Sequence, residues 1–311
     1  MKNKKTSKLG ILVILILLLA FGIFKENSDI IDNEPNSEKI RATEVIENEL
    51  KKDDEAVFKN KLLVHFLDVG QGDCELVCLP SGKVMLIDAG DNGEESIITR
   101  YLDKLGIKRI DYLVATHPHA DHIGGMEEII KGYEIGEIYM PRVEAESKTF
   151  ERMLDAIDEK GLLIHTGEAG KVIFSEDSIK ARILSPPKGK LYEDKNNNSL
   201  VIKLEYQDRS FLFTGDIEED AERDILSAKE YIFADVLKVA HHGSSTSSIS
   251  EFIDKTQPQY AVISCGEGNE YGHPHKETLD KLESLGIKVL RTDELGTIII
   301  TTDGKNLEVE N

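Results

Sequence analysis

Cysteine is scarce in this sequence. Three cysteines occur among the 311 residues, Cys74, Cys78 and Cys265, and no two of them form a Cys-x-x-Cys pair. The absence of that pair excludes a zinc ribbon and a dithiol redox motif, and an odd number of thiols cannot all pair within one chain. Because Cys74 and Cys78 stand at even spacing in an apolar run, we expect them to pack as small core residues.

Positive charge is also in short supply. The chain has 38 Lys and Arg residues against 58 Asp and Glu residues, a net charge of −20. Such a field repels polyanions unless a local basic patch or a bound metal intervenes, so the charge argues against a passive DNA-binding module. Hydrophobic residues make up 40% of the sequence, which is enough to bury a sizeable core.

The N-terminus carries the one long apolar run. Four lysines within the first eight residues precede the uncharged stretch Leu9–Phe24. The stretch is slightly shorter than the roughly 17–25 residues of a membrane span, and the lysines are expected on the cytoplasmic side. We therefore predict a single-pass protein of the cell membrane whose folded part is extracellular. The alternative is a cleaved signal ending near Ala20-Phe21-Gly22, which would make the protein secreted.

Three regions are expected along the chain. Residues 1–24 form a membrane anchor or signal helix, residues 25–60 form a polar linker, and residues 61–311 form the folded domain. Within that domain, runs of β-branched residues alternate with helical patterns. Strands are expected at residues 62–67, 75–79, 84–87, 112–116, 137–140, 179–184, 200–206, 210–214, 236–240, 260–264, 288–291 and 297–300. Helices are expected at residues 95–105, 123–131, 148–159, 218–227, 250–255 and 276–285. This order predicts an α/β fold in which two sheets lie between outer helices, a four-layer sandwich.

The chemistry concentrates after one predicted strand. His117, His119, Asp121 and His122 fall within six positions, directly before Gly124-Gly125. Imidazole nitrogen and carboxylate oxygen suit Zn²⁺, Mn²⁺ or iron, and this spacing lets two histidines bind one ion while Asp121 and His122 bind its neighbour. The motif predicts a centre of one or two divalent metal ions, Zn or Mn.

Two further strands end in polar residues that fit such a centre. Thr214-Gly215 places Asp216 at a strand tip, where its carboxylate can bridge two cations. Another strand ends at His241-His242-Gly243; one of these histidines would complete the second ion's shell, and the other would transfer protons or stabilise charge. The sequence leaves open which is which. His273 is expected to line the site, His275 to be exposed at a helix start, and His65 and His165 to be structural residues.

The order of these motifs resembles the metallo-β-lactamase superfamily of hydrolases. The segments 66–73, 86–90, 198–201, 241–244 and 272–274 narrow the resemblance to the extracellular hydrolase domain of ComEC-type DNA-internalisation competence proteins, over about residues 61–303. It implies an αββα sandwich in which the metal ligands are His117, His119, Asp121, His122, Asp216 and one of His241 or His242. By the same resemblance, Asp68 and Asp88 line the floor of the cleft and orient ligands.

Two departures from that family are visible. The usual third histidine of the first metal is missing, and Asn198 or Ser199 stands near its place, as in the competence group. The first ion is therefore expected to bind weakly, to prefer Mn²⁺, or to be absent. The competence proteins also carry this domain on a multi-span channel, whereas this chain has one hydrophobic segment. It cannot form a channel by itself, and a separate channel protein is one candidate partner.

These features predict a metal-dependent extracellular phosphodiesterase or nuclease related to competence-type DNA uptake. In the expected mechanism, Asp121 and Asp216 orient a hydroxide between two cations for attack on a phosphate ester, and His242 or His273 assists the leaving group. The alternatives are hydrolysis of another bond, such as a cell-wall phosphocholine ester, a lactone or a β-lactam, and a non-catalytic surface module stabilised by metal. The oligomeric state is not predicted.

Overall fold

The computed structural model describes residues 61–310 of the chain. The predicted anchor at residues 1–24 and the predicted linker at residues 25–60 lie outside these residues. Within the described part, none of the helices combines the length and the apolar composition that crossing a bilayer requires.

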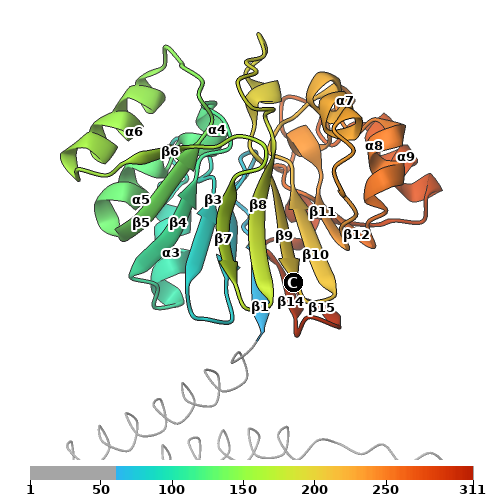
Figure 1. Cartoon of the computed structure of the whole chain (residues 1–311), viewed down its shortest axis with the longest axis horizontal. Coiled ribbons are helices and arrows are strands. Elements are labelled where there is room, and N and C mark those ends of the chain that lie inside the picture. Colours follow the sequence, from blue (N-terminus) through green and yellow to red (C-terminus); the bar gives the residue numbers. More distant parts are fainter. Residues whose placement is uncertain (1–60, 311) are drawn as a thin grey trace, which may run out of the picture. The chain divides into compact units, whose positions relative to one another are not determined.

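Two mixed β-sheets lie face to face at the centre of the domain (Figure 1). The first has the strand order β15-β14-β1-β2-β3-β4-β5-β6. Its strands are β1 (Leu62–Phe66), β2 (Glu75–Cys78), β3 (Val84–Ile87), β4 (Arg109–Val114), β5 (Glu134–Met140), β6 (Ile164–Thr166), β14 (Ile298–Thr302) and β15 (Leu307–Glu310). The second has the order β13-β12-β11-β10-β9-β8-β7. Its strands are β7 (Val172–Glu176), β8 (Ile179–Ser185), β9 (Val201–Tyr206), β10 (Arg209–Phe213), β11 (Val236–Lys238), β12 (Tyr260–Ile263) and β13 (Lys288–Arg291).

The central strands are apolar on both faces because each sheet is covered on both sides. In β3, Met85 and Ile87 point into the core between the sheets, while Leu86 points into the core beneath the helices of the first sheet. In β10, Phe213 faces the core between the sheets and Leu212 faces the helices of the second. Successive side chains of a strand point to opposite faces, so a continuous apolar run is what a doubly covered strand requires.

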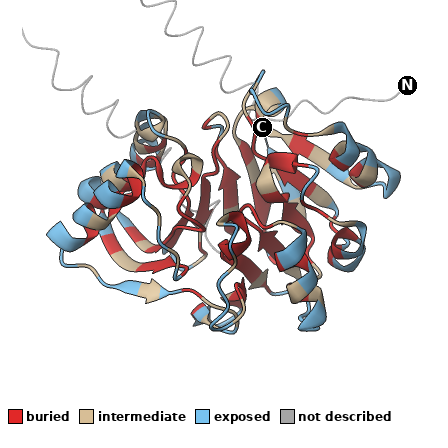
Figure 2. Ribbon diagram, turned by 90° about the horizontal axis from the view of Figure 1, so that it is seen from above, coloured by how far each residue is buried: buried red, intermediate tan, exposed pale blue. Residues whose placement is uncertain are grey.

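Helices form the two outer layers. Those on the first sheet are α3 (Glu95–Lys104), α4 (Ala120–Ile123), α5 (Met126–Gly132) and α6 (Lys148–Glu159). Those on the second are α7 (Glu219–Ser227), α8 (Ser250–Thr256) and α9 (Lys276–Ser284). Shorter helical segments are α10 (Thr292–Leu295), η1 (Asn196–Asn198) and η2 (Ala240–Gly243). Figure 2 shows buried strands in the middle and exposed outer faces on the helices, which confirms the predicted four-layer arrangement.

The structure differs from the sequence-based expectation in several elements. Strands β6, β7 and β15 were not expected; β6 has three residues and lies at a sheet edge, where burial imposes no alternation. The helix expected at residues 123–131 is divided into α4 and α5 at Gly124-Gly125. The amides of these two glycines donate to the carbonyl oxygens of Gly90 and Ala89. A side chain on Gly124 would lie 2.1 Å from the backbone of Asp91, so this close approach requires glycine.

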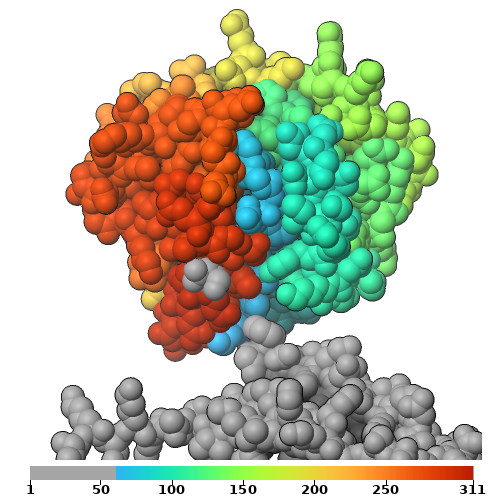
Figure 3. All heavy atoms as spheres, turned by 180° about the vertical axis from the view of Figure 1, so that it is seen from behind, coloured from blue at the N-terminus to red at the C-terminus, as the bar shows by residue number. Residues whose placement is uncertain are grey.

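The parallel strands determine where loops gather. Strands β3 to β6 are mutually parallel, and so are β10 to β13. Their carboxyl ends, and the loops after β4, β10 and β11, therefore lie along one edge of the sandwich, which is where open α/β sheets bind ligands. Seen from behind in Figure 3, the blue surface near β1 lies between the C-terminal segments and those near residue 100, as expected from the pairing of β1 with β14 and β2.

Candidate metal centre

Four side chains from three loops converge at this edge. Asp121 and His122 follow β4, Asp216 follows β10, and His242 follows β11; one ligand atom of each lies within 4.8 Å of the others. The Asp216 Oδ2 atom is 3.2 Å from His122 Nε2 and 3.5 Å from His242 Nε2, and Asp121 Oδ2 is 3.4 Å from His242 Nε2. Two imidazole nitrogens and two carboxylates at this spacing form a ligand set that suits a divalent transition metal.

His117 and His119 form a second pair beside these four residues. His117 Nε2 lies 3.1 Å from His119 Nδ1 and 3.9 Å from Asp216 Oδ2. Asp216 therefore stands between the two groups, as a bridging carboxylate would. The second group contains two histidines and the shared aspartate, so it offers fewer ligands than the first.

The buried polar atoms of the centre fit a cation. Nε2 of His122, Nε2 of His242 and Oδ1 of Asp216 are buried and form no hydrogen bond within the protein. Burying such atoms without a partner is unfavourable, and the two imidazole nitrogens both lie within 3.5 Å of the other carboxylate oxygen of Asp216. A cation bound between the two rings and this carboxylate would satisfy both nitrogens, so the residues present fit the metal that the sequence predicts.

Second contacts orient the two buried imidazoles. His122 Nδ1 lies 2.7 Å from Asp88 Oδ2, and Asp88 also accepts hydrogen bonds from the amide and the hydroxyl of Thr116. His242 Nδ1 lies 3.0 Å from the carbonyl oxygen of Ser264, which can only accept. Both rings thus direct Nδ1–H outward and turn the Nε2 lone pair toward the cluster, the tautomer that a metal ligand needs.

The backbone after β11 is strained at the site. His241 and His242 both adopt left-handed φ values, 51° and 53°, and Gly243 follows at 82°. Consecutive non-glycine residues in this region cost about 1–3 kcal/mol each and persist only where the surroundings impose them. The turn directs the His242 ring inward, where it is 1% exposed, while His241 remains partly exposed.

Charge pairing dominates the electrostatics of the centre. Burial alone would lower the pKa values of His122 and His242, but Asp216 and the other nearby carboxylates outweigh it and hold both pKa values well above the ordinary one. For His117, burial and the charge of His122 lower the pKa well below its ordinary value, so that ring stays neutral. Metal binding at His122 and His242 must therefore displace protons.

A buried layer of charge lies directly beneath the ligands. We call Asp73, Glu75, Asp88 and Lys238 the floor of the centre; each is at most 1% exposed. Lys238 Nζ lies 2.7 Å from Asp73 Oδ2, and Asp73 Oδ1 lies 3.3 Å from His242 Nδ1. Burial would raise the pKa of Asp73, but Lys238 and then His242 lower it to about 2. For Glu75, burial and the charge of Asp73 raise the pKa well above its ordinary value.

The sequence does not predict Asp73 and Lys238 as site residues. Both lie next to predicted motifs, since Asp73 follows the Gly70-Gln71-Gly72 turn and Lys238 precedes the His241-His242 pair. Asp73 ends the Gly70-Gln71-Gly72 turn, and its amide donates to the carbonyl oxygen of Asp121 at 3.1 Å. A side chain on Gly72 would lie 2.3 Å from that same oxygen. The second glycine thus lets this turn pack against the metal-binding loop, a role beyond that of a simple tight turn. Lys238 lies in an apolar strand, and a lysine at such a position is the feature of the sequence that could have indicated a buried charge here.

Comparison with known proteins bears on the same stretch of chain. The family model of the metallo-beta-lactamase superfamily matches residues 67–267, which include Asp73, the ligand cluster and Lys238. The chain belongs to the metallo-beta-lactamase superfamily.

Two curated proteins match about three quarters of this chain. ComE operon protein 3 of Bacillus subtilis (strain 168) is 36% identical over 253 residues, which cover 76% of this chain and 32% of that protein. Competence protein ComA of Neisseria gonorrhoeae is 30% identical over 248 residues, 78% of this chain and 33% of that protein. The chain therefore spans about a third of the length of these relatives. A solved metal-dependent hydrolase of the beta-lactamase superfamily shares the fold, with a TM-score of 0.50 and 12% identity over 74% of this chain and 95% of that one.

The rim of this superfamily site is less buried than its floor. We call His241 and His273 the rim. His241 Nε2 lies 3.9 Å from Asp216 Oδ2, and its Nδ1 lies 3.2 Å from Glu218 Oε1. The structure thus places both histidines of the pair near Asp216, but it is the His242 nitrogen that joins the cluster of four ligand atoms.

His273 is held by Gln71. Gln71 Oε1 accepts a hydrogen bond from the amide of Gly266, which leaves Gln71 Nε2 as the donor to His273 Nδ1 at 3.2 Å. Burial and the charge of His242 lower the pKa of His273 to about 4, so the ring is neutral at neutral pH. Because Nδ1 accepts, the proton of the neutral ring lies on Nε2.

The remaining predicted residues support loops. Ser199 Oγ accepts the Asp216 amide at 3.1 Å, whereas the Asn198 side chain bonds to backbone atoms of Tyr192 and Asp194 within its own loop. Asp68 is exposed, and its carboxylate accepts from the Gly70 amide, so it stabilises that turn rather than lining the floor. The other histidines bond outside the ligand cluster: His65 to Tyr101, His165 near Glu137, and His275 to Ser245. Cys74 and Cys265 are buried free thiols and Cys78 is partly buried.

Proposed function

We propose that this member of the superfamily is a metal-dependent phosphodiesterase that acts on DNA outside the cell. The observation that carries the proposal is the convergence of Asp121, His122, Asp216 and His242 to within 4.8 Å. The similarity to two competence proteins supports a DNA phosphodiester as the substrate. Because the domain has an acidic overall composition, an anionic substrate needs the positive charge of bound cations to approach.

Each ligand has a place in this proposal. Asp121, His122, Asp216 and His242 would hold one divalent ion, and His117, His119 and Asp216 would hold the other, more weakly bound ion. Zn²⁺ and Mn²⁺ both suit this ligand set. When bound, such ions lower the pKa of water and neutralise charge on substrate oxygens. The bridging position of Asp216 between the two groups supports its assignment to both ions.

His273 is assigned to the leaving group. Its Nδ1 accepts from Gln71, and its neutral ring presents Nε2–H as a hydrogen-bond donor. A neutral donor of this kind stabilises negative charge as it develops on the departing oxygen. His242 has no such freedom, because Ser264 and the ligand cluster occupy its two nitrogens.

A substrate panel tests the reaction. The full chain is incubated with single-stranded DNA, bis-p-nitrophenyl phosphate and a chromogenic β-lactam, each with Mn²⁺ and with Zn²⁺. We expect hydrolysis of the two phosphodiesters and loss of that hydrolysis in Asp121→Ala and His122→Ala. Hydrolysis of the β-lactam alone would assign the chain to another chemistry, and full activity in both variants would exclude the proposed centre.

We also propose that the chain is tethered to the cell membrane by its N-terminal segment and works beside a separate channel protein. The lysines that precede the apolar run Leu9–Phe24 support this orientation. Membrane fractionation of cells that express the full chain, followed by protease treatment of intact cells, tests it. Recovery in the membrane fraction together with protease sensitivity is expected. A protease-resistant cytoplasmic domain would contradict the orientation.

A further inference from the structure

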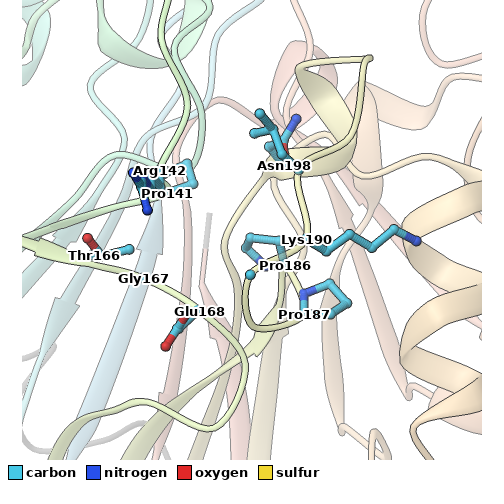
Figure 4. A pocket seen from close by; sticks show the side chains of 11 residues that line it. Pro141, Arg142, Thr166, Gly167, Glu168, Pro186, Pro187, Lys190 and Asn198 are labelled. Atoms are coloured by element: carbon cyan, nitrogen blue, oxygen red, sulfur yellow. The ribbon is translucent and has the colours of Figure 1, made fainter.

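A pocket lies between loops of the two sheets, at the same edge as the metal centre. It has a volume of about 420 Å³. Figure 4 shows Arg142 and Pro141 on one wall and Pro186 and Pro187 on the facing wall. Leu191, which is 64% exposed, also lines it. The pocket therefore combines apolar ring faces with a guanidinium group.

The pocket adjoins the side of the centre that holds His117 and His119. Pro141 directly follows β5, whose Tyr139 pairs with Val114 of β4, so Pro141 stands beside the first residues of the metal-binding loop. On the other side, Asn198 lines the pocket and is followed by Ser199, which bonds to the Asp216 amide. Both walls of the pocket are therefore next to loops that carry metal ligands.

Two cationic side chains without an ion-pair partner in the described part of the chain, those of Arg142 and Lys195, stand on or beside these walls. Arg142 is exposed, and among residues 61–310 no carboxylate lies within ion-pair distance of Arg142 or of Lys195. The carbonyl oxygen of Lys195 accepts a hydrogen bond from the amide of Asn198, which lines the pocket, so Lys195 belongs to the loop that forms this wall. The other charges here are already matched: Lys190 points away from the pocket in Figure 4 and pairs with Asp224, and Glu168 pairs with Lys188 at 3.7 Å.

We propose that this pocket is a subsite for the nucleotide next to the cleaved phosphodiester of a single-stranded polynucleotide, with Lys195 and Arg142 contacting its phosphates. The inference rests on the proposed function and names its substrate as a polymer rather than a small diester. Proline rings and Leu191 offer apolar surface for a base, and cations that contact backbone phosphates supply the sequence-independent part of strand binding. A volume of about 420 Å³ lies in the range of pockets that hold one ligand of small-molecule size, such as a nucleotide.

The test compares a polymer with a small substrate. Full-length wild type, Arg142→Gln, Lys195→Gln and the double variant are assayed with Mn²⁺ on a labelled single-stranded oligonucleotide and on bis-p-nitrophenyl phosphate. Lys255→Gln is the matched control, because Lys255 is an exposed lysine on α8 and the change removes the same charge. The same proteins are titrated with the oligonucleotide in EDTA, and fluorescence anisotropy reports binding without catalysis.

For the double variant, we expect the KM for the oligonucleotide to rise roughly tenfold, while hydrolysis of the small diester stays unchanged. The salt dependence of binding should also become shallower, by about 0.7 in log–log slope for each phosphate that the protein no longer neutralises. Lys255→Gln should match the wild type in every assay.

Three results separate the subsite from the proposed reaction. Unchanged oligonucleotide KM and salt slope in the double variant would overturn the subsite while leaving the phosphodiesterase intact. Tighter binding of duplex than of single strand would overturn it as well. If the wild type cleaves neither substrate but binds the strand through Arg142 and Lys195, the subsite stands and the proposed reaction fails.

Discussion

The floor and the rim of the metal centre are built in opposite ways. The floor residues Asp73, Glu75, Asp88 and Lys238 lie on strands or in the loops beside them and are almost completely buried, and Asp73 and Lys238 form a close ion pair. The rim residue His241 lies in the short segment η2 and His273 lies on a loop, where a hydrogen bond from Gln71 holds its ring. A buried charge that loses its partner costs several kcal/mol, whereas a half-exposed one is rescued by water. The floor should therefore control stability and metal affinity, and the rim should control the reaction.

Replacing Lys238 is expected to have the largest effect on the free energy of unfolding. Lys238→Met removes the cation that pairs with Asp73 at 2.7 Å and leaves a buried carboxylate alone, so we expect a loss of about 3–5 kcal/mol in the free energy of unfolding. Urea unfolding of the metal-free protein measures it. The double variant Lys238→Met/Asp73→Asn removes both charges and should recover most of the loss. A loss below about 1 kcal/mol in the single variant would show that the floor is not a tightly coupled charge layer.

The second largest effect is expected in the pH dependence of the free energy of unfolding, which tests the charge of Asp73 in the floor. The folded pKa of Asp73 is about 2 and its unfolded value is 3.8, so the carboxylate stabilises the fold above the unfolded value. That contribution is lost as the pH falls through 3.8 toward 2 and amounts to about 2 kcal/mol. In unfolding experiments in EDTA, Asp73→Asn should lose less stability than the wild type over this range. Parallel curves for the two proteins would contradict the pairing.

Metal affinity should respond to the floor more than to neighbouring surface charge. Asp88→Asn weakens the contact that orients His122, so we expect metal affinity to fall roughly 10–100-fold in a chelator competition assay. Asp68→Asn is the matched control, since Asp68 is an exposed carboxylate that bonds within its turn. Equal losses in the two variants would point to general electrostatics and not to orientation of His122.

The smallest of these effects is expected at the rim. His273→Ala should slow phosphodiester hydrolysis about tenfold while leaving metal content and the free energy of unfolding unchanged. Because burial and the charge of His242 lower the pKa of His273 to about 4, the ring stays neutral at higher pH. The ratio of the rates of variant and wild type should therefore be constant between about pH 6 and pH 8. A ratio that varies with pH in this range would show that His273 titrates during turnover.

Much of the site was predictable because it is contiguous in sequence. His117, His119, Asp121 and His122 fall in one loop after an apolar strand, so their convergence needs only local geometry. The roles within His241-His242 were not predictable, because two left-handed residues in succession decide which ring turns inward. Asn198 and Ser199 were expected at the same place, but the structure gives them different partners, since the first folds back on its own loop.

By itself, the sequence determined the layers and the metal-binding loop. The apolar pattern of a strand indicates whether one or both of its faces are covered. A dense cluster of histidines with an aspartate is typical of a metal site. Only the tertiary structure decided the floor. Asp73 and Lys238 are far apart in the sequence, and their charges meet because strands of two different sheets end at the same edge. The tertiary structure also determines edge strands such as β6. These segments become strands because they pair with a neighbouring strand, and not because of their residue pattern.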